Sequence, residues 1–394
     1  MRILTTGHSH WARSGYGTQG AYLMQAFQEL GHTVFCMPHY GLQGGPLSKD
    51  GVEYLPLYRD GWGHDIIAQH VKNCKIDAVL SFHDVWVLRP SFPRSFDVPW
   101  ITYSPVDSVP VMPALTRILR EAKHVVAMSR FGQDEMRKKG IDSFYIPHAI
   151  DTDIFRPGDK REAREVLGIP QDKFICLIAA ANAYYPSRKA FPEQMLAFAE
   201  FHKEFPDSIL LFHTALIPHS PAAGGLDINE LIRNLELQHC TGNTEDYDIC
   251  MGLPDEQMAL MYRAADVLLG ASYAEGFGLV QAECQASGTP VIVHDFAASP
   301  EFLFGGIKVP SIQKFWNLGG CWQALPSVPA ITRALREVYL NREEYAEIGL
   351  AAAKRVQEEL SQVYVRDTYW RPFLEEVEVG ISNDWAASGE AFAG

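Results

Sequence analysis

At 394 residues the chain is long enough for two or three domains with complete hydrophobic cores, which excludes a single small binding module. Apolar residues make up 47% and charged residues 21%, as in ordinary folded proteins and unlike disordered, collagenous or disulfide-stapled chains. Lys and Arg number 34 against 48 Asp and Glu, and the net charge of -14 disfavours broad binding to nucleic acid through phosphate contacts.

The cysteines and the opening segment indicate the cellular compartment in which the protein is expected. The seven cysteines are odd in number and include no CxxC pair, so we expect reduced thiols. The opening MRILTTGHSH is typical of a strand and lacks the features of a signal peptide, and no apolar run reaches the roughly 18 residues of a membrane span. We therefore expect a cytoplasmic protein that is neither secreted nor membrane-spanning.

The first 150 residues alternate between apolar strand patterns and helical patterns. Strands are expected at 2–6, 33–36, 76–82, 100–103, 124–128 and 144–150. The alternation predicts an α/β fold with parallel sheets. The first helix is expected to begin after Gly17 and to end at Gly31. Its apolar face would comprise Ala21, Met24, Phe27 and Leu30.

A glycine-rich segment, SGYGTQ at 14–19, follows the first strand and can face a diphosphate. Its glycines fit G-x-G-x-x-G as Gly15, Gly17 and Gly20. However, no acidic residue ends the second strand, so the dinucleotide-binding fingerprint is incomplete. A tight structural turn is the alternative interpretation.

Polar residues follow two strands of this first half. His83 and Asp84 lie in SFHDVW (81–86), and Asp107 lies in YSPVDSVP (103–110). Ligands bind outside the carboxyl ends of parallel strands, so these side chains are candidates for a binding site. The alternative for His83 is a histidine that only satisfies its hydrogen bonds at a strand end.

The segment 117–139, called the basic segment below, carries seven cations against three acidic residues, a local charge of +4. The cations are Arg117, Arg120, Lys123, Arg130, Arg137, Lys138 and Lys139, and the acids are Glu121, Asp134 and Glu135. A solvated helix face explains this pattern, and so does attraction to an anionic acceptor, either a membrane lipid or a nucleic acid.

A stretch rich in Pro, Gly and charge at 151–170 interrupts the apolar pattern and marks a domain boundary. The predicted N-terminal domain is 1–160 and the second is 161–365. Within the second, strands are expected at 174–180, 208–215, 266–272 and 290–296, a helix from Pro192 to about Phe205, and mainly helix over 328–376. This alternation of strands and helices predicts two Rossmann-like halves.

The end of the chain is expected to close the molecule. Tyr369, Trp370 and Phe373 predict that 366–380 is a helix that packs back on the first domain, and Pro372 is expected to kink or restart it. The small and polar residues of 381–394 predict a flexible tail.

Two cations precede the helix at 192–205. Arg188 and Lys189 lie in SRKA (187–190), in the loop after the strand at 174–180. Cations at such a place can neutralise the charge that develops on a departing diphosphate. A solvated surface pair is the alternative.

The most informative segment is AEGFGLVQAE (274–283), between the strands at 266–272 and 290–296. Its turn and first helical residues, Gly276, Phe277, Gly278 and Leu279, predict a close backbone approach and an anion site suited to a diphosphate. Glu275 precedes the helix and Glu283 lies inside it. Eight residues at the helical rise span roughly 12 Å, so one carboxylate can hold a transferred sugar and the other a ribose. The alternative is a strand-to-helix turn whose Glu complements the helix dipole.

Together with MGLPDEQMALMYRAADVLL (251–269) and ASGTPVIV (286–293), this segment resembles the retaining glycosyltransferases of GT-B fold, which include glycogen synthases, sucrose synthases and many bacterial mannosyl- and glucosyltransferases. The resemblance extends over nearly the whole chain, through IPHAIDTDIFRP (146–157). It implies two Rossmann-like domains that face each other across a cleft, an N-terminal acceptor domain and a C-terminal donor domain. It also implies retaining transfer of a sugar from a UDP-sugar or GDP-sugar to an acceptor hydroxyl.

The resemblance assigns roles in the donor domain. In such enzymes the first glutamate of E-x7-E contacts the donor sugar and the second the ribose, and Glu275 and Glu283 match these positions. Lys189 matches a lysine that acts on the diphosphate. Relatives carry an arginine where this chain has Asn182, and Arg188 is a candidate to supply the missing charge.

In the acceptor domain the resemblance is less specific. It implies that His83, with Asp84 as second candidate, contacts the donor sugar or the acceptor, and that Gly15 and Gly17 line the donor phosphates and the acceptor pocket. Asp107 is a candidate for contact with the acceptor.

Neither a metal nor a cofactor is expected. Asp151 and Asp153 imitate the DxD metal motif of a different glycosyltransferase fold, but they lie in a linker, where Asp serves turns and caps. The 14 histidines form no HExxH motif and no Cys/His metal spacing. The alternatives that stay open are a sugar-nucleotide epimerase of similar architecture and a glycosyltransferase that acts on nucleic acid. A nicotinamide oxidoreductase would need the complete fingerprint. Attachment to a membrane surface through the basic segment also stays open.

Overall fold

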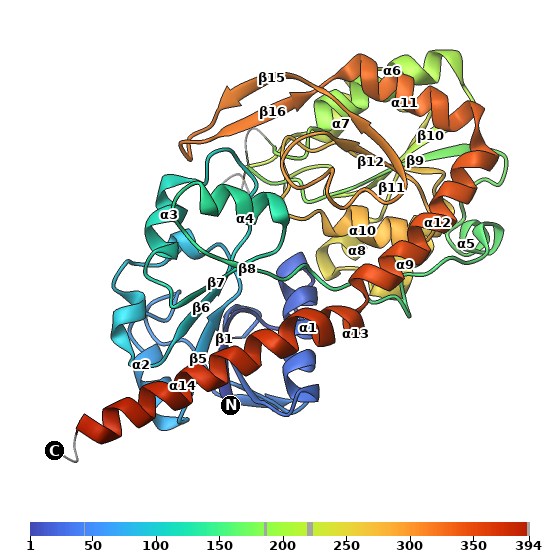
Figure 1. Ribbon diagram of the computed structural model, residues 1–394. Coiled ribbons are helices and arrows are strands. Elements are labelled where there is room, and N and C mark those ends of the chain that lie inside the picture. The colour runs from blue at the N-terminus through green and yellow to red at the C-terminus, as the bar shows by residue number, and fades with distance from the viewer. Residues whose placement is uncertain (43, 185–186, 219–223, 392–394) are drawn as a thin grey trace. The chain divides into compact units, whose positions relative to one another are not determined.

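The computed structural model describes residues 1–42, 44–184, 187–218 and 224–391, with the side chains of 384–391 excepted (Figure 1). The chain forms two compact units. Unit 1 comprises Met1–Val106, Pro110–Ala149 and Gln362–Gly394, and unit 2 comprises Asp107–Val109 and Ile150–Ser361. The chain thus passes between units after Ala149 and after Ser361, where the sequence suggests boundaries at 160 and 365.

Among the described residues, the sheet of unit 1 has eight strands in the order β3-β4-β2-β1-β5-β6-β7-β8. These are β1 (Arg2–His8), β2 (Thr33–Tyr40), β3 (Leu47–Lys49), β4 (Val52–Tyr54), β5 (Ala78–Ser81), β6 (Trp100–Tyr103), β7 (His124–Ala127) and β8 (Phe144–Tyr145). All neighbouring pairs are parallel except β3 and β4. The helical elements before the return of the chain are α1 (Gly15–Glu29), α2 (Ile67–Asn73), η1 (Val85–Val87), η2 (Phe92–Ser95), α3 (Pro113–Leu119) and α4 (Arg130–Arg137).

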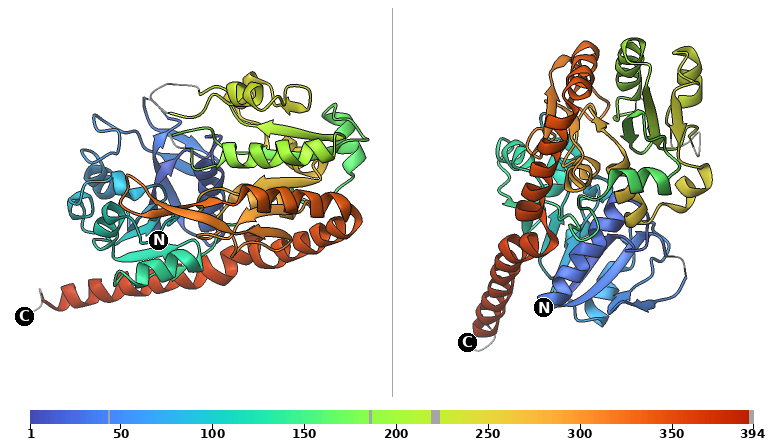
Figure 2. Two further views of the ribbon diagram at one scale, coloured as in Figure 1. Left: turned by 90° about the horizontal axis from the view of Figure 1, so that it is seen from above. Right: turned by 90° about the vertical axis from the view of Figure 1, so that its right-hand side faces the viewer.

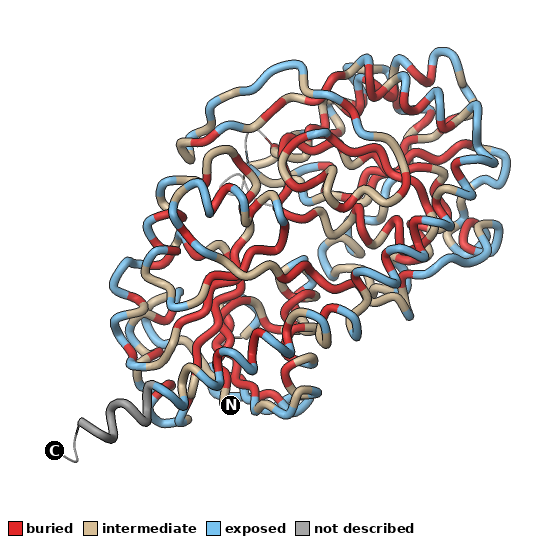
Figure 3. The backbone as a smooth tube through the Cα atoms, in the orientation of Figure 1, coloured by how far each residue is buried: buried red, intermediate tan, exposed pale blue. Residues whose placement is uncertain are grey.

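The central strands of unit 1 are apolar along their length because both faces of a parallel sheet are covered. Ile3 and Leu4 of β1 and Val79 of β5 are fully buried. Figure 3 shows these strands as continuous buried segments. Leu4 and Val79 share a core with residues of the surrounding helices such as Ile118.

Helix α1 begins at Gly15, three residues before the predicted start after Gly17. Ser14 has extended backbone, and its Oγ accepts a hydrogen bond from the Gly17 N–H at 3.1 Å, which is the geometry of an N-cap. The two glycines therefore belong to the first helical turn and not to a loop. Of the predicted apolar face, Met24 and Phe27 are buried, whereas Ala21 and Leu30 are partly exposed.

The chain returns to unit 1 through α13 (Gln362–Val365), the π-helical turn η4 (Arg366–Trp370) and α14 (Arg371–Ala391). The helix changes type just before Pro372, whose ring fits the first turn of α14. Trp370 is buried, and its ring lies 5.2 Å from that of Phe27 and 5.4 Å from that of Tyr103.

Helix α14 extends past residue 381, where the sequence predicts a flexible tail. Residues 381–391 contain no proline and include several alanines, a composition compatible with helix. Residues 392–394 of the predicted tail lie outside the described residues.

In unit 2 the described residues form a parallel sheet in the order β11-β10-β9-β12-β13-β14, with helices on both faces (Figure 2). The strands are β9 (Phe174–Ala179), β10 (Ser208–His213), β11 (Thr241–Asn243), β12 (Val267–Gly270), β13 (Val291–His294) and β14 (Gly306–Val309). The helices are α5 (Lys160–Val166), α6 (Phe191–Glu204), α7 (Ile228–Asn234), α8 (Asp246–Met251), α9 (Asp255–Ala264), α10 (Leu279–Ala286), α11 (Val328–Leu340) and α12 (Arg342–Leu360). The α/β class with parallel sheets is as the sequence predicts.

An antiparallel hairpin of β15 (Ser311–Trp316) and β16 (Trp322–Pro326) follows the parallel sheet of unit 2. Two backbone hydrogen bonds join Trp322 to Val109, with N···O distances of 2.7 and 3.2 Å. The hairpin thereby holds the segment Asp107–Val109 on unit 2.

Both parallel sheets have a point where the strand order reverses, between β1 and β5 in unit 1 and between β9 and β12 in unit 2. Ligands of open α/β sheets bind at the carboxyl ends of strands beside such a point. Within the described residues, no helix combines the length and the apolar character that crossing a bilayer requires.

Candidate functional site

A cluster of charged side chains in unit 2 lies where β9 and β12 end. Arg188 and Lys189 follow β9, and Glu275 follows β12. Each oxygen of the Glu275 carboxylate accepts one hydrogen bond at 2.7 Å, Oε2 from Arg188 Nη1 and Oε1 from Lys189 Nζ. The backbone joins the same two loops, because the Tyr273 N–H donates to the Arg188 carbonyl at 2.8 Å. The structure therefore brings three predicted site residues together at the switch point of the sheet.

This cluster fixes the charge of Glu275. Burial alone would raise the pKa of this carboxyl, but Arg188 and Lys189 outweigh that effect and hold the pKa at about 2. Burial lowers the pKa of Lys189, and the charge of Glu275 opposes this change. Glu275 is therefore ionised at any physiological pH and can accept hydrogen bonds but cannot donate a proton.

Glu283 has different surroundings. It lies on α10, and its Oε2 accepts a hydrogen bond from the Tyr262 hydroxyl of α9 at 2.9 Å. Burial raises the pKa of Glu283 to about 8, with a smaller contribution from the negative charge of Asp255. Near neutral pH this carboxyl therefore keeps its proton while Glu275 does not.

The turn between the two glutamates has the geometry of an open helix N-terminus. Gly278 caps α10 with a φ of 96°, a left-handed value that favours glycine. As a glycine it offers no side chain to the N–H groups of the first turn, which starts at Leu279. Phe277 is buried against Phe302, with ring centroids 4.0 Å apart, and this contact anchors the turn next to Gly276. The predicted anion site thus retains its backbone donors.

The structure gives a packing role to Asn182, where the resemblance predicts an arginine. Its Nδ2 donates to the carbonyls of Ala215 and Leu226 at 2.9 and 2.7 Å, and its Oδ1 accepts from the Leu226 N–H at 2.8 Å. Arg188 instead contacts Glu275 and lies 3.6 Å from Asp107 Oδ2. Asp107, a candidate for contact with the acceptor, therefore lies beside the charged cluster of unit 2.

In unit 1 the carboxyl ends of β2, β1 and β5 bring histidines together. His83 is buried, and its Nε2 lies 3.3 Å from Nε2 of His39. The Trp62 ring stacks on His83 with centroids 5.9 Å apart. Burial, followed by the neighbouring His39, lowers the pKa of His83 well below its usual value, so the ring is neutral. His8, at the end of β1, completes the group beside Tyr16.

The sequence pattern points to His83 but gives no prediction for His8 or His39. Each of the two lies at the carboxyl end of its strand, within β1 and β2 respectively. A histidine at the end of each predicted strand is the signal that could have identified them. Asp84, the second candidate, precedes the turn η1 and is partly buried.

Of the two glycines predicted to line the phosphates, Gly17 is explained by packing. A Cβ on Gly17 would lie 1.9 Å from the Ala12 carbonyl oxygen, and the Gly17 N–H is engaged by Ser14. Gly15 is exposed at the start of α1. For Gly17 these contacts favour the structural interpretation, whereas contact with phosphate stays a prediction for both residues.

Several cations of the basic segment have partners. Arg137 pairs with Asp134 at 2.6 Å, and Lys138 pairs with Glu135. The Arg130 guanidinium lies 3.7 Å from the centroid of the Tyr145 ring. Arg137 and Lys138 are thus paired with acids one helical turn away, and the local charge of +4 already includes these acids.

Comparison with known proteins agrees with this geometry. The sequence pattern described as "Glycosyl transferases group 1" matches residues 159–355, half of the chain. The chain is 28% identical over 283 residues to D-inositol 3-phosphate glycosyltransferase 2 of Catenulispora acidiphila, covering 70% of this chain and 58% of that protein. It is 33% identical over 176 residues to the D-inositol 3-phosphate glycosyltransferase of Nocardia farcinica, covering 44% and 36%. The chain thus spans less than two thirds of the length of these relatives.

Solved structures share the whole fold. Sucrose-phosphate synthase from Thermosynechococcus elongatus superposes with a TM-score of 0.77 at 17% identity, covering 96% of this chain and 100% of that one. HepE of Anabaena in complex with UDP-glucose superposes with a TM-score of 0.68 at 15% identity, covering 97% and 100%. The predicted GT-B fold class is confirmed, and the comparisons favour neither an epimerase nor an oxidoreductase.

Proposed function

This chain belongs to the group 1 glycosyl transferases, and from that premise we propose that it moves a sugar from a nucleoside-diphosphate sugar to an acceptor hydroxyl with retention of configuration. The observation that carries the proposal is the cluster of Arg188, Lys189 and Glu275 at the switch point of unit 2. Two cations beside a permanently ionised carboxylate supply one group for sugar hydroxyls and two for a diphosphate.

The chemistry follows from these charges. In an oxocarbenium-like transition state, positive charge builds on the sugar and negative charge on the leaving phosphate. Lys189, Arg188 and the first turn of α10 stabilise the leaving group, because their positive charge or dipole is fixed before the bond breaks. We expect transfer on the front face, with the leaving phosphate taking the proton of the acceptor.

The donor is a UDP-sugar or a GDP-sugar, and UDP-glucose is the first probe because HepE, which shares the fold, was solved with it. Glu283 holds the ribose. Its carboxyl lies on α10, one helical turn beyond the backbone donors that would bind the diphosphate.

For the acceptor we propose an anionic, phosphorylated polyol. The two relatives above are named for D-inositol 3-phosphate. In this chain the acceptor would bind to unit 1, with the neutral His83 among its contacts and the basic segment as the source of attraction. A nucleic acid or a membrane lipid is the competing anionic acceptor.

The test is a transfer assay. The purified chain is given UDP-glucose or GDP-mannose with inositol phosphate, inositol, single-stranded DNA or anionic vesicles, and the anomeric configuration of the product is read by NMR. We expect an α-linked product from the α-linked donor, and the same rate with EDTA, because the chemistry needs no metal. A β-linked product would contradict retention, and loss of activity in EDTA that Mg²⁺ or Mn²⁺ restores would contradict the metal-independent mechanism.

A further inference from the structure

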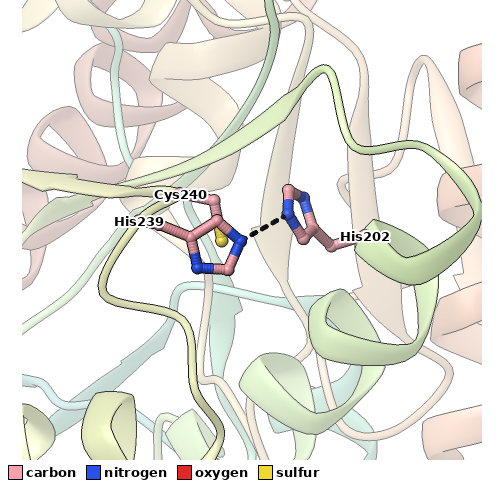
Figure 4. A group of neighbouring side chains, drawn as sticks. All are labelled: His202, His239 and Cys240. Atoms are coloured by element: carbon pink, nitrogen blue, oxygen red, sulfur yellow. Dashed lines mark hydrogen bonds between the residues drawn. The ribbon is translucent and has the colours of Figure 1, made fainter.

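Three side chains of types that commonly bind metals lie together near the amino ends of strands in the unit 2 sheet (Figure 4). His202 lies in the last turn of α6, and His239 and Cys240 lie between α7 and β11. One ligand atom of each lies within 4.8 Å of the others. The two Nε2 atoms are 3.1 Å apart. Two nitrogen ligands of a tetrahedral zinc ion are separated by about 3.3 Å, so the imidazoles already have close to the required spacing.

A neighbouring hydroxyl orients His202. Ser208 Oγ donates to the Phe205 carbonyl at 2.7 Å, so its lone pairs are available to His202 Nδ1 at 2.9 Å. Nδ1 therefore carries the proton and donates it, which leaves a lone pair on Nε2 that faces His239. Metal-binding histidines make such a second hydrogen bond, which fixes the tautomer.

The remaining two residues complete a set of nitrogen and sulfur ligands. Cys240 is buried, and its thiol donates to the Leu237 carbonyl at 3.4 Å. Zn²⁺ binds a cysteine as its thiolate, so binding of the ion would displace this thiol proton. His239 is exposed and gives an ion a path from solvent. Imidazole and thiolate suit Zn²⁺, whereas Mg²⁺ and Ca²⁺ prefer oxygen ligands.

We propose that His202, His239 and Cys240 form a Zn²⁺ site, with a solvent molecule as fourth ligand. The ion would tie the end of α6 to the start of β11. This site lies at the amino ends of the strands, whereas Lys189 and Glu275 follow their carboxyl ends. The 14 residues of α6 separate His202 from Lys189 by roughly 20 Å, so the ion stabilises unit 2 and takes no part in the transfer.

The first test measures Zn²⁺ binding to the metal-free full chain by competition with a chromogenic chelator. We expect one Zn²⁺ per chain and a higher Tm in its presence. His239→Ala removes an exposed side chain, leaves the fold intact and should weaken the affinity roughly 100-fold or more. The matched control is Cys250→Ser, which removes an exposed cysteine outside the cluster and should bind like the parent chain. No stoichiometric binding, or binding that His239→Ala leaves unchanged, would overturn the proposal.

The second test identifies the ligands. Co²⁺ bound to the parent chain should show thiolate-to-cobalt charge transfer, which Cys240→Ser abolishes and Cys250→Ser retains. Ser208→Ala frees the tautomer of His202 and should weaken Zn²⁺ binding about 10- to 100-fold. A charge-transfer band that disappears in Cys250→Ser and persists in Cys240→Ser would assign the metal to adventitious surface binding and refute the site.

Discussion

Glu275 and Glu283 stand eight residues apart, yet their surroundings move their pKa values in opposite directions. Burial raises both, but two cations reverse the effect at Glu275 and bring its pKa to about 2, whereas Glu283 faces a neutral Tyr262 hydroxyl and reaches about 8. When two carboxyl groups have different environments, their pKa values differ and they can take different chemical roles. One carboxylate is a fixed negative charge, and the other can change its protonation state when a ligand binds.

Glu283→Ala should weaken binding of the free nucleotide. A carboxylate that accepts hydrogen bonds from ribose hydroxyls contributes about 1.5 to 3 kcal/mol for each bond. Calorimetry with UDP and GDP measures the loss, and Glu256→Ala, an exposed glutamate on the neighbouring α9, is the control. Unchanged nucleotide affinity in Glu283→Ala would remove the ribose from its role.

Glu283 should also make the stability of the nucleotide-free protein depend on pH. In the folded chain this carboxyl keeps its proton up to about pH 8, whereas its ordinary pKa is 4.5. Between these values the folded state binds more protons than the unfolded state, so the group lowers the free energy of unfolding as pH rises. Glu283→Gln should be more stable than the parent chain, by a margin that grows from pH 5 to pH 8 in urea titrations. A margin that stays constant over this range would show that the pKa of Glu283 is not raised.

Lys189→Ala should lower kcat more than it raises KM. The charge that Lys189 neutralises grows as the bond to the diphosphate breaks, so the interaction is strongest in the transition state. Steady-state kinetics with the donor separates the two constants, and Lys203→Ala, an exposed change on α6, controls for general effects on the helix. If KM alone changes, Lys189 only binds the ground state.

At the scale of elements, the start of α1 shows that one glycine-rich sequence is compatible with both a loop and the first turn of a helix. The sequence SGYGTQ predicts a glycine-rich loop, but Ser14 caps the helix one turn early and Gly17 packs on the Ala12 carbonyl. The contact that decides the outcome involves the loop before the helix, which a reading of helix periodicity does not include.

The same helix offers a matched pair of substitutions. Gly17→Ala places a Cβ 1.9 Å from the Ala12 oxygen and should destabilise unit 1 by about 1 to 3 kcal/mol. Gly20→Ala places one 3.8 Å from the His8 oxygen, an ordinary contact, and should stabilise the helix by about 0.5 to 1 kcal/mol. Urea unfolding compares the two variants. Equal effects of the two changes would contradict the packing explanation.

The sequence predicts the long parallel strands well, because a strand buried on both faces is a continuous apolar run. Trp100–Tyr103 is observed as predicted, and the neighbouring strands agree within a few residues. Short strands at or next to a sheet edge, such as β4 and β11, have only three residues each and give no such run. The sequence pattern does not indicate the hairpin β15–β16, because its pairing depends on partners across a turn.

The functional residues also fall into those that the sequence predicts and those that it does not. Arg188, Lys189 and Glu275 are predicted from charge and from their places after strands, and the structure joins them. By contrast, the meeting of His202 with His239 depends on how α6 packs beside the turn before β11, and 36 residues of sequence between them hide it. Spacing along the chain reveals a metal site only when the ligands share one local motif.

At the scale of the whole molecule, a chain with a net charge of -14 carries a segment of +4 between 117 and 139. Neutralising Arg137, Lys138 and Lys139 should raise KM for an anionic acceptor and leave donor hydrolysis unchanged. Raising the salt to physiological strength should have the same effect, because exposed charges are screened over about 8 to 10 Å. Arg233→Gln and Lys203→Gln, exposed changes in unit 2, form the control. Acceptor kinetics that ignore both changes would favour a neutral sugar as acceptor.

The return of the chain to unit 1 has a consequence for synthesis on the ribosome. Trp370 completes the packing around Phe27 and Tyr103. The ribosome, however, makes the 212 residues of 150–361 after Phe27 and Tyr103 and before Trp370. At about 5 to 20 residues per second, that interval lasts on the order of tens of seconds. Unit 2 is continuous over this stretch and can fold as it emerges, while the nascent N-terminal unit waits with an apolar surface uncovered. The earliest-made part of the protein is thus the last to be finished, and until then its uncovered apolar surface favours aggregation.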